Sequence, residues 1–138
     1  MIFNTLLPEL YISDFDKSIH FYRDILGFRV EYTREDPKFA FLSYGKSQLM
    51  IQELEQGEKE KEKLDYPYGR GINFQIETKR VQTIIDNLAG NKHPLTRGIK
   101  DSWYIGKGVS YGCREILVQD PDGYLLRFSE DLGEKKTI

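Results

Sequence analysis

Residues 14–27, DFDKSIHFYRDILG, begin with a residue type that caps helices and end with one that stops them. An aspartate before a helix accepts hydrogen bonds from the first free amides, and a glycine supports the backbone turn that ends a helix. Between these two residues, Phe21, Tyr22 and Ile25 recur at helical spacing. The stretch therefore predicts an amphipathic helix that begins at Asp14 and is closed by Gly27.

The same arrangement occurs a second time, later in the chain. Thr78 precedes a run of apolar residues at helical spacing, Val81, Ile84 and Leu88, which is closed by Gly90. Each predicted helix follows one strand-like run and precedes three more. The runs are 7–12, 28–32, 39–44 and 48–53 in the first half, and 72–77, 102–105, 114–119 and 124–129 in the second. The sequence therefore predicts an α+β fold made of two βαβββ modules.

The two modules are expected to form one domain over residues 1–138. The first module covers residues 1–55 and the second covers residues 70–132, with a charged loop, 56–69, between them. Glutamate and lysine alternate in this loop, so like charges stand four residues apart and disfavour a helix. The loop is therefore predicted to be solvated and mobile.

Composition and charge narrow the range of functions. The formal net charge is −2 and the isoelectric point is near 5.7, which argues against nucleic acid as a partner. The single cysteine excludes an internal disulfide and a cysteine-rich zinc site. No apolar run has the length of a signal peptide or a membrane span, so we expect a cytoplasmic protein without a membrane partner.

Two stretches carry a resemblance to a known family. Residues 12–30, ISDFDKSIHFYRDILGFRV, and residues 114–130, REILVQDPDGYLLRFSE, resemble the glyoxalase/bleomycin resistance/dioxygenase superfamily, also called the vicinal oxygen chelate superfamily. The resemblance implies that the curved sheets of the two modules form a cup, usually completed in a homodimer. In the enzymes of this family, His and Glu side chains hold a divalent metal in the cup.

The positions that the resemblance assigns to the metal ligands are unsuited to a metal. They are Leu7, Met50, Gly71 and Arg127. Aliphatic and glycine side chains donate no lone pair, a thioether is too soft for Mg, Mn or Zn, and a guanidinium is a permanent cation. We therefore expect no metal and no other cofactor.

Arg127 needs an anionic or polar partner if it lies in such a cup. Glu9 and the amides of Asn73 and Gln75 are expected on the same face, so we interpret one of these as its partner. An acidic group on a ligand is the alternative.

Within the superfamily, the bleomycin-resistance branch keeps the cup and lacks the metal, which implies a protein that binds an aromatic, cationic drug without turnover. Pro8 matches a proline of that branch and favours an N-terminal arm exchanged between protomers of a homodimer. Tyr111 stands where the branch has a stacking tryptophan, and Phe39 matches its partner aromatic. The predicted ligand-binding residues are Phe39, Phe41, Trp103, Tyr111, Gly112, Glu35, Asp36 and Arg127.

Other functions remain open at this point. The main interpretation is a non-catalytic binding protein, so no catalytic residue is assigned. One alternative is a lyase, isomerase or dioxygenase of the same superfamily. Another is an accessory protein that binds a small molecule unrelated to antibiotics.

Overall fold

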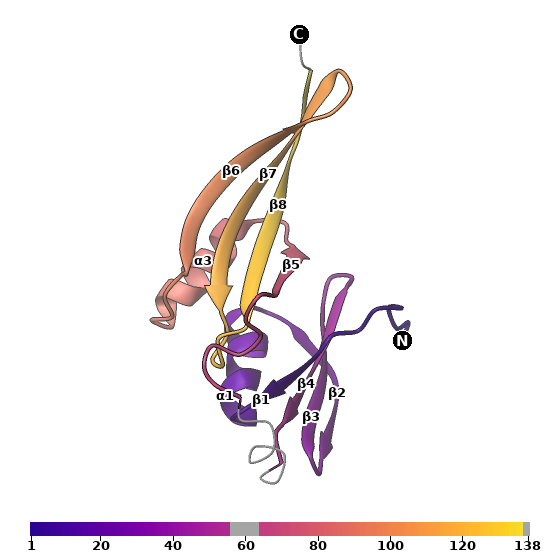
Figure 1. The fold of residues 1–138 in the computed structure, drawn as a ribbon, viewed down its shortest axis with the longest axis vertical. Helices are drawn as coiled ribbons and strands as arrows, with labels where there is room; N and C mark the ends of the chain where they lie inside the picture. Colours follow the sequence, from indigo (N-terminus) through magenta and orange to yellow (C-terminus); the bar gives the residue numbers. More distant parts are fainter. Residues whose placement is uncertain (56–63, 137–138) are drawn as a thin grey trace. The chain divides into compact units, whose positions relative to one another are not determined.

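The structure is a computed structural model that describes residues 1–55 and 64–136. The chain divides into two compact units, each with one four-stranded sheet (Figure 1). The first unit comprises Met1–Arg70 and Asp120–Tyr124, and the second comprises Gly71–Gln119 and Leu125–Ile138. Part of the predicted charged loop, residues 56–63, lies outside the described residues.

The first unit contains one βαβββ module. Its elements are β1 (Glu9–Ile12), α1 (Phe15–Ile19), the π-helical continuation η1 (His20–Ile25), β2 (Arg29–Glu35), β3 (Lys38–Tyr44) and β4 (Ser47–Glu53). The strand order is β1-β4-β3-β2, with β1 parallel to β4 and the other pairs antiparallel. The helix crossover is what allows β1 and β4 to run parallel.

The second unit repeats this order. Its elements are β5 (Asn73–Glu77), α3 (Val81–Gly90), β6 (Arg97–Ile105), β7 (Val109–Gln119) and β8 (Leu125–Lys136). The strand order is β5-β8-β7-β6, with β5 parallel to β8. The predicted α+β fold of two βαβββ modules is therefore confirmed. The homodimer with an arm exchanged at Pro8 stays a prediction.

The two helices begin differently, and the sequence predicted only one start correctly. Asp14 caps α1 as expected, since its side chain accepts a hydrogen bond from the Lys17 amide at 3.1 Å. The second helix begins at Val81 rather than next to Thr78, and its extended N-cap residue, Arg80, makes no side-chain capping bond. Thr78 instead continues the strand pairing, because its amide donates to the Ser129 carbonyl.

A glutamate from the last strand of each module completes the cap. In the first unit, the Phe15 amide donates to Glu53 at 2.8 Å. In the second unit, the Val81 amide donates to Glu130 at 2.9 Å. A carboxylate at a helix N-terminus also interacts favourably with the helix dipole. The duplication has therefore preserved a helix cap that the sequence pattern did not reveal.

Each sheet has one face that contributes to the core of its own unit. In the second sheet, the core side chains are Ile76, Ile116, Val118, Leu126 and Phe128, and they are buried. Helix α3 packs against β7 and β8 and adds its own buried apolar side chains. Because side chains alternate along a strand, the residues between these core positions point to the opposite face. We call this opposite face the open face of each sheet.

Strands β6, β7 and β8 are longer than the sequence predicted. The predicted runs 102–105, 114–119 and 124–129 cover only part of each strand. Residues 102–105 of β6 pair with the first part of β7, which pairs with the last part of β8, and together they form an arm that extends beyond α3 (Figure 1). The arm residues lack strict alternation of apolar and polar residues. Antiparallel pairing with neighbouring strands nevertheless satisfies their backbone groups, so the strands continue.

Neither helical segment in the described parts of the chain has both the length and the hydropathy to span a lipid bilayer.

Candidate functional site

The turn Asp120–Tyr124 has a structural role. The Tyr22 hydroxyl donates to Asp120 at 2.7 Å, and the amides of Asp122 and Tyr124 both donate to the same carboxyl group at 2.9 Å. Burial raises the pKa of Asp120 to about 6. Asp122 accepts hydrogen bonds from the backbone and the hydroxyl of Ser13. The oxygens of both carboxylates accept hydrogen bonds from other groups of the protein, and these bonds hold the turn within the first unit.

Aromatic side chains form a cluster on the open face of the first sheet, which also carries Glu9, Gln52 and Arg34. The rings of Tyr32 and Phe41 stack with centroids 5.3 Å apart, and Phe3 meets Phe41 edge-on at 5.3 Å. Tyr32 also lies 5.9 Å from Phe39. Phe39 is 3% exposed and Phe41 is fully buried. Both residues were predicted to bind a ligand, and in the structure other side chains of the chain already cover their rings.

The predicted acidic residues Glu35 and Asp36 lie where β2 turns into β3, at the edge of the first unit. They line a cleft of about 690 Å³ together with Lys38, Glu53 and Glu55. Both side chains are exposed. They lie at the turn end of this hairpin, and their predicted role in ligand binding stays a prediction.

The residues at the family's metal positions do not fit a metal ion. Leu7 precedes β1, Met50 lies within β4, Gly71 precedes β5 and Arg127 lies within β8. None of these side chains is a suitable ligand for a divalent cation. In the parts of the chain that the structure describes, no group of three or more His, Cys, Asp or Glu side chains is arranged to hold a metal.

The open face of the second sheet has no aromatic side chain in its two central rows of cross-strand partners. One central row is Arg97, Leu117, Arg127 and Gln75, and the other is Lys100, Glu115, Ser129 and Glu77. The next row toward the arm holds Ser102, Cys113 and Asp131. Charged and hydrogen-bonding groups from all four strands are thereby brought together.

Glu115 and Arg127 form an ion pair across these rows. Nη1 of Arg127 lies 3.7 Å from Oε2 of Glu115, and the side chains are 36% and 8% exposed, respectively. Arg127 was expected to pair with Glu9, Asn73 or Gln75, but the ion pair that it forms within the second unit is with Glu115 of the neighbouring strand β7. Arg97 adds a long hydrogen bond, 3.5 Å, to the Glu115 carbonyl.

Glu115 was missed at the level of the sequence. A signal for it exists in REILVQ, residues 114–119, where Ile116 and Val118 alternate with Glu115, Leu117 and Gln119. Since cross-strand partners share a face, the residues that face Arg127 from β7 belong to this second set. A carboxylate on that face was therefore foreseeable from the alternation alone.

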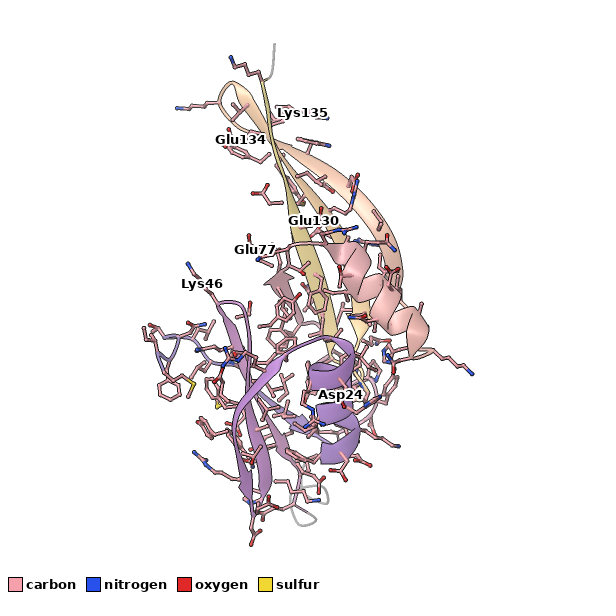
Figure 2. The ribbon with its side chains drawn as sticks, turned by 180° about the vertical axis from the view of Figure 1, so that it is seen from behind. Asp24, Lys46, Glu77, Glu130, Glu134 and Lys135 are labelled. Carbon is pink, nitrogen blue, oxygen red and sulfur yellow. The ribbon has the colours of Figure 1, made fainter. Side chains whose placement is uncertain are left out.

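The predicted aromatic residues of the arm lie on opposite faces. Trp103 pairs with Gly112, whereas the next pair is Tyr104 with Tyr111, so Trp103 and Tyr111 point away from each other. The Trp103 ring lies over Gly112, where an added Cβ would come within 2.6 Å of the ring. Nζ of Lys135 lies 3.8 Å from the ring centroid, and Figure 2 shows Lys135 on the distal part of β8.

A curated relative of this chain is an enzyme. The lactoylglutathione lyase of Haemophilus influenzae is 28% identical over 137 residues, which cover 94% of this chain and 93% of the relative. The expectation of a binding protein without enzymatic activity is therefore wrong, because the comparison points to catalytic members of the family.

Solved structures share the fold. The fosfomycin resistance protein FosX from Listeria monocytogenes is 18% identical, with a TM-score of 0.64 and coverage of 95% of this chain and 94% of that one. A glyoxalase/bleomycin resistance protein/dioxygenase from Alicyclobacillus acidocaldarius is 15% identical, with a TM-score of 0.66 and coverage of 94% and 92%. At these identities, the likeness is one of fold.

The sequence pattern of one family spans most of the chain. It matches residues 3–128, which include β1 to β7 and the first part of β8. Its description unites glyoxalases, bleomycin-resistance proteins and dioxygenases, so it does not single out the bleomycin-resistance branch. The chain belongs to the Glyoxalase/Bleomycin resistance protein/Dioxygenase superfamily.

Proposed function

We propose that this protein is a lyase or isomerase that moves a proton at the carbon next to a carbonyl group of a small molecule. The proposed active site is the open face of the second sheet. The observation that carries the proposal is Glu115, a carboxylate that is 8% exposed and paired with Arg127 at 3.7 Å. A buried carboxylate with a specific charged partner is typical of acid–base sites. The enzyme name of the curated relative supports the same reaction class.

Each residue of the pair has a distinct role in the proposed reaction. The Glu115 carboxylate accepts the proton from the carbon, and the electron pair of the broken C–H bond moves toward the carbonyl oxygen, which becomes an enolate. Arg127 donates N–H groups to this developing negative charge. Protonated Glu115 then returns the proton to the same carbon, which restores the substrate. Where that carbon carries a hydroxyl group, Glu115 can instead give the proton to the former carbonyl carbon, while the hydroxyl passes its own proton to the enolate oxygen and becomes the new carbonyl. Either course of the reaction conserves atoms and electrons and uses no oxidant or reductant.

An antibiotic-binding role has less support from the structure. It relied on Phe39 and Phe41 as stacking surfaces, and both rings are buried. It also relied on Trp103 and Tyr111, which point to opposite faces of the arm. The open face of the second sheet, by contrast, offers charged groups at the centre of a sheet, where strands on both sides fix their positions.

The proposed function is tested by exchange of hydrogen for deuterium at carbon. Lactoylglutathione is incubated with the protein in heavy water, and proton NMR follows the signal of the hydrogen on the carbon beside the thioester carbonyl. The wild type is expected to exchange this hydrogen. Glu115→Gln keeps the shape but cannot accept a proton, so the rate should fall roughly 100- to 10,000-fold.

A matched control distinguishes catalysis from a general loss of structure. Glu134 lies on the arm, away from the proposed site (Figure 2), so Glu134→Gln should exchange hydrogen at the wild-type rate. Circular dichroism would show that both variants are folded. Wild-type exchange rates in folded Glu115→Gln, or no exchange by the wild type, would contradict the proposal.

A further inference from the structure

We infer that Ser129 is a second catalytic residue of the proposed reaction, and that its hydroxyl group carries a proton between two oxygens of the substrate. This inference rests on the proposed function, because it assigns one step of that reaction to a residue of the same open face. It concerns substrates in which the reacting carbon carries a hydroxyl group beside the carbonyl, as in lactoylglutathione. For such substrates, Ser129 is what makes isomerisation possible in addition to hydrogen exchange.

Isomerisation of such a substrate needs two proton transfers. The first moves a proton from one carbon to its neighbour, and Glu115 performs it in the proposed reaction. The second moves a proton from the hydroxyl oxygen to the former carbonyl oxygen. A group that mediates this second transfer must accept one proton and donate another, and a hydroxyl group can do both.

Ser129 lies directly opposite the proposed base. It is the cross-strand partner of Glu115 in the antiparallel pair of β7 and β8. Side chains at such positions have their Cβ atoms about 4.5–5.5 Å apart. Arg127 is two residues earlier in β8, so its side chain lies on the same face as that of Ser129. The base, the guanidinium that faces the developing enolate and the hydroxyl group are therefore neighbours.

The surroundings of Ser129 favour a role in proton transfer. Its backbone is held by pairing with Glu115 on one side and Glu77 on the other, and its carbonyl accepts a hydrogen bond from the Thr78 amide at 2.9 Å. The position of the residue therefore does not depend on its hydroxyl group, which is left for a substrate. Ser129 is also 7% exposed, so bulk water has little access to the protons that it transfers.

Other side chains of the two central rows are less suited to this step. The cationic side chains of these rows donate protons in hydrogen bonds but have no acceptor. The amide of Gln75 is neither an acid nor a base. Glu77 can accept and donate a proton, but it is exposed and lies one strand farther from Glu115, on the other side of Ser129.

The step balances without a further reactant. In the enolate, the adjacent hydroxyl group gives its proton to Oγ of Ser129, while Oγ gives its own proton to the enolate oxygen. The negative charge then lies on the other substrate oxygen. The C–O bond of that oxygen becomes the new carbonyl double bond when Glu115 returns its proton to the former carbonyl carbon. Ser129 ends the step with one proton, as it began.

The test compares two rates of the same protein. Hydrogen exchange of lactoylglutathione in heavy water needs Glu115 and not the relay, since the proton leaves and returns at one carbon. Isomerisation needs both, and it is followed from the hemithioacetal isomer, prepared from methylglyoxal and glutathione, by the absorbance of the thioester that forms. Ser129→Ala should keep hydrogen exchange within about twofold of the wild type and lower isomerisation about tenfold to 1,000-fold. Ser129→Thr keeps a hydroxyl group and should recover most of the lost rate.

Ser102→Ala is the matched control. Ser102 lies on the same face in the next row toward the arm, opposite Cys113, so its loss should leave both rates unchanged. An equal fall of both rates in Ser129→Ala, or unchanged isomerisation in that variant, would overturn the inference. A selective loss of isomerisation in Glu77→Gln, with normal isomerisation in Ser129→Ala, would assign the relay to Glu77 and overturn it as well.

The outcomes separate this inference from the proposed function. Hydrogen exchange by the wild type without any isomerisation would overturn the relay and leave the proton transfer by Glu115 in place. No hydrogen exchange by the wild type would instead contradict the proposed function itself.

Discussion

The open faces of the two sheets have the same position in a duplicated module, but aromatic rings cluster on the first and not in the two central rows of the second. In the first sheet, this face holds stacked aromatic rings, and the ring of Phe3 from the N-terminal segment lies against Phe41. In the second sheet, the equivalent face holds Arg97, Lys100, Glu115 and Arg127. Both modules keep a glutamate cap on the first amide of their helix. Duplication has therefore preserved the helix-facing side and allowed the other side to diverge.

The difference teaches where function resides in this chain. A covered aromatic face contributes free energy to folding, because large apolar area is removed from water. A face with a nearly buried carboxylate and three cations gains less from burial, since each charged group must be desolvated. Such a cost is typical of a site used for binding or catalysis.

The largest effect is expected for the aromatic face. Phe41→Ala should lower the free energy of unfolding by about 3–5 kcal/mol, because it removes a fully buried ring beneath Tyr32 and Phe3. Leu117→Ala, on the half-buried open face of the second sheet, should cost only about 1–2 kcal/mol. Denaturant unfolding measures both values. Equal losses would mean that the two faces contribute alike to stability.

A smaller effect on stability is expected at Asp120, in the turn Asp120–Tyr124 of the first unit. Burial raises the pKa of Asp120 to about 6, so the folded protein favours the neutral carboxyl group. The stabilisation from this proton is complete below about pH 4, the value for an unfolded aspartate, and is lost as the pH rises to about 6. Between pH 4 and pH 7, the free energy of unfolding of the wild type should fall by about 2–3 kcal/mol relative to that of Asp120→Asn. Unfolding experiments at several pH values measure this difference.

The control for this pH dependence is Asp65→Asn, which alters an exposed carboxyl group of the same unit. Its stability should follow that of the wild type at every pH. If Asp120→Asn also followed the wild type, burial would not hold the pKa of Asp120 above its usual value as described.

The paired helix caps allow a direct comparison of the modules. Glu130→Ala should destabilise the protein by about 1 kcal/mol, because Arg80 provides no other side-chain cap for α3. Glu53→Ala should cost less, since Asp14 still caps α1. Thermal unfolding of both variants tests the order. A greater loss for Glu53→Ala would contradict the explanation that Asp14 compensates for the missing glutamate at the start of α1.

The smallest effect is expected on the arm. Lys135→Ala removes a cation that lies 3.8 Å from the Trp103 ring centroid and should cost about 0.5–1 kcal/mol. Because Trp103 is the only tryptophan of the sequence, fluorescence reports its surroundings directly. The emission should change in Lys135→Ala and not in Lys136→Ala, the neighbouring control. Identical spectra would argue against this contact in solution.

The sequence predicted the fold well because the duplication appears in local patterns. Asp14, the apolar spacing after it and the Asp-Gly turn before β8 are each readable without tertiary contacts. The ends of the elements were less predictable. Helix α3 begins at Val81 because Glu130, distant in sequence, caps it, and β6 reaches Arg97 through pairing with β7.

The candidate site was harder to predict for a physical reason. Arg127 was identified by its position, but its partner depends on the register between β7 and β8, which a single sequence does not specify. The register between β6 and β7 likewise places Trp103 and Tyr111 on opposite faces, although both were expected to bind one ligand. The burial of Phe41 likewise depends on Phe3, a residue outside any predicted element.

The most direct test of the account is to map where lactoylglutathione binds. Backbone amide signals of the labelled Glu115→Gln variant, which should bind without turnover, are followed by NMR during the titration. We predict that the largest shifts occur in β5–β8, at residue 115, Arg127 and Gln75, with small changes in β2–β4. Shifts concentrated around Phe39 and Phe41 would contradict the claim that the second sheet carries the active site.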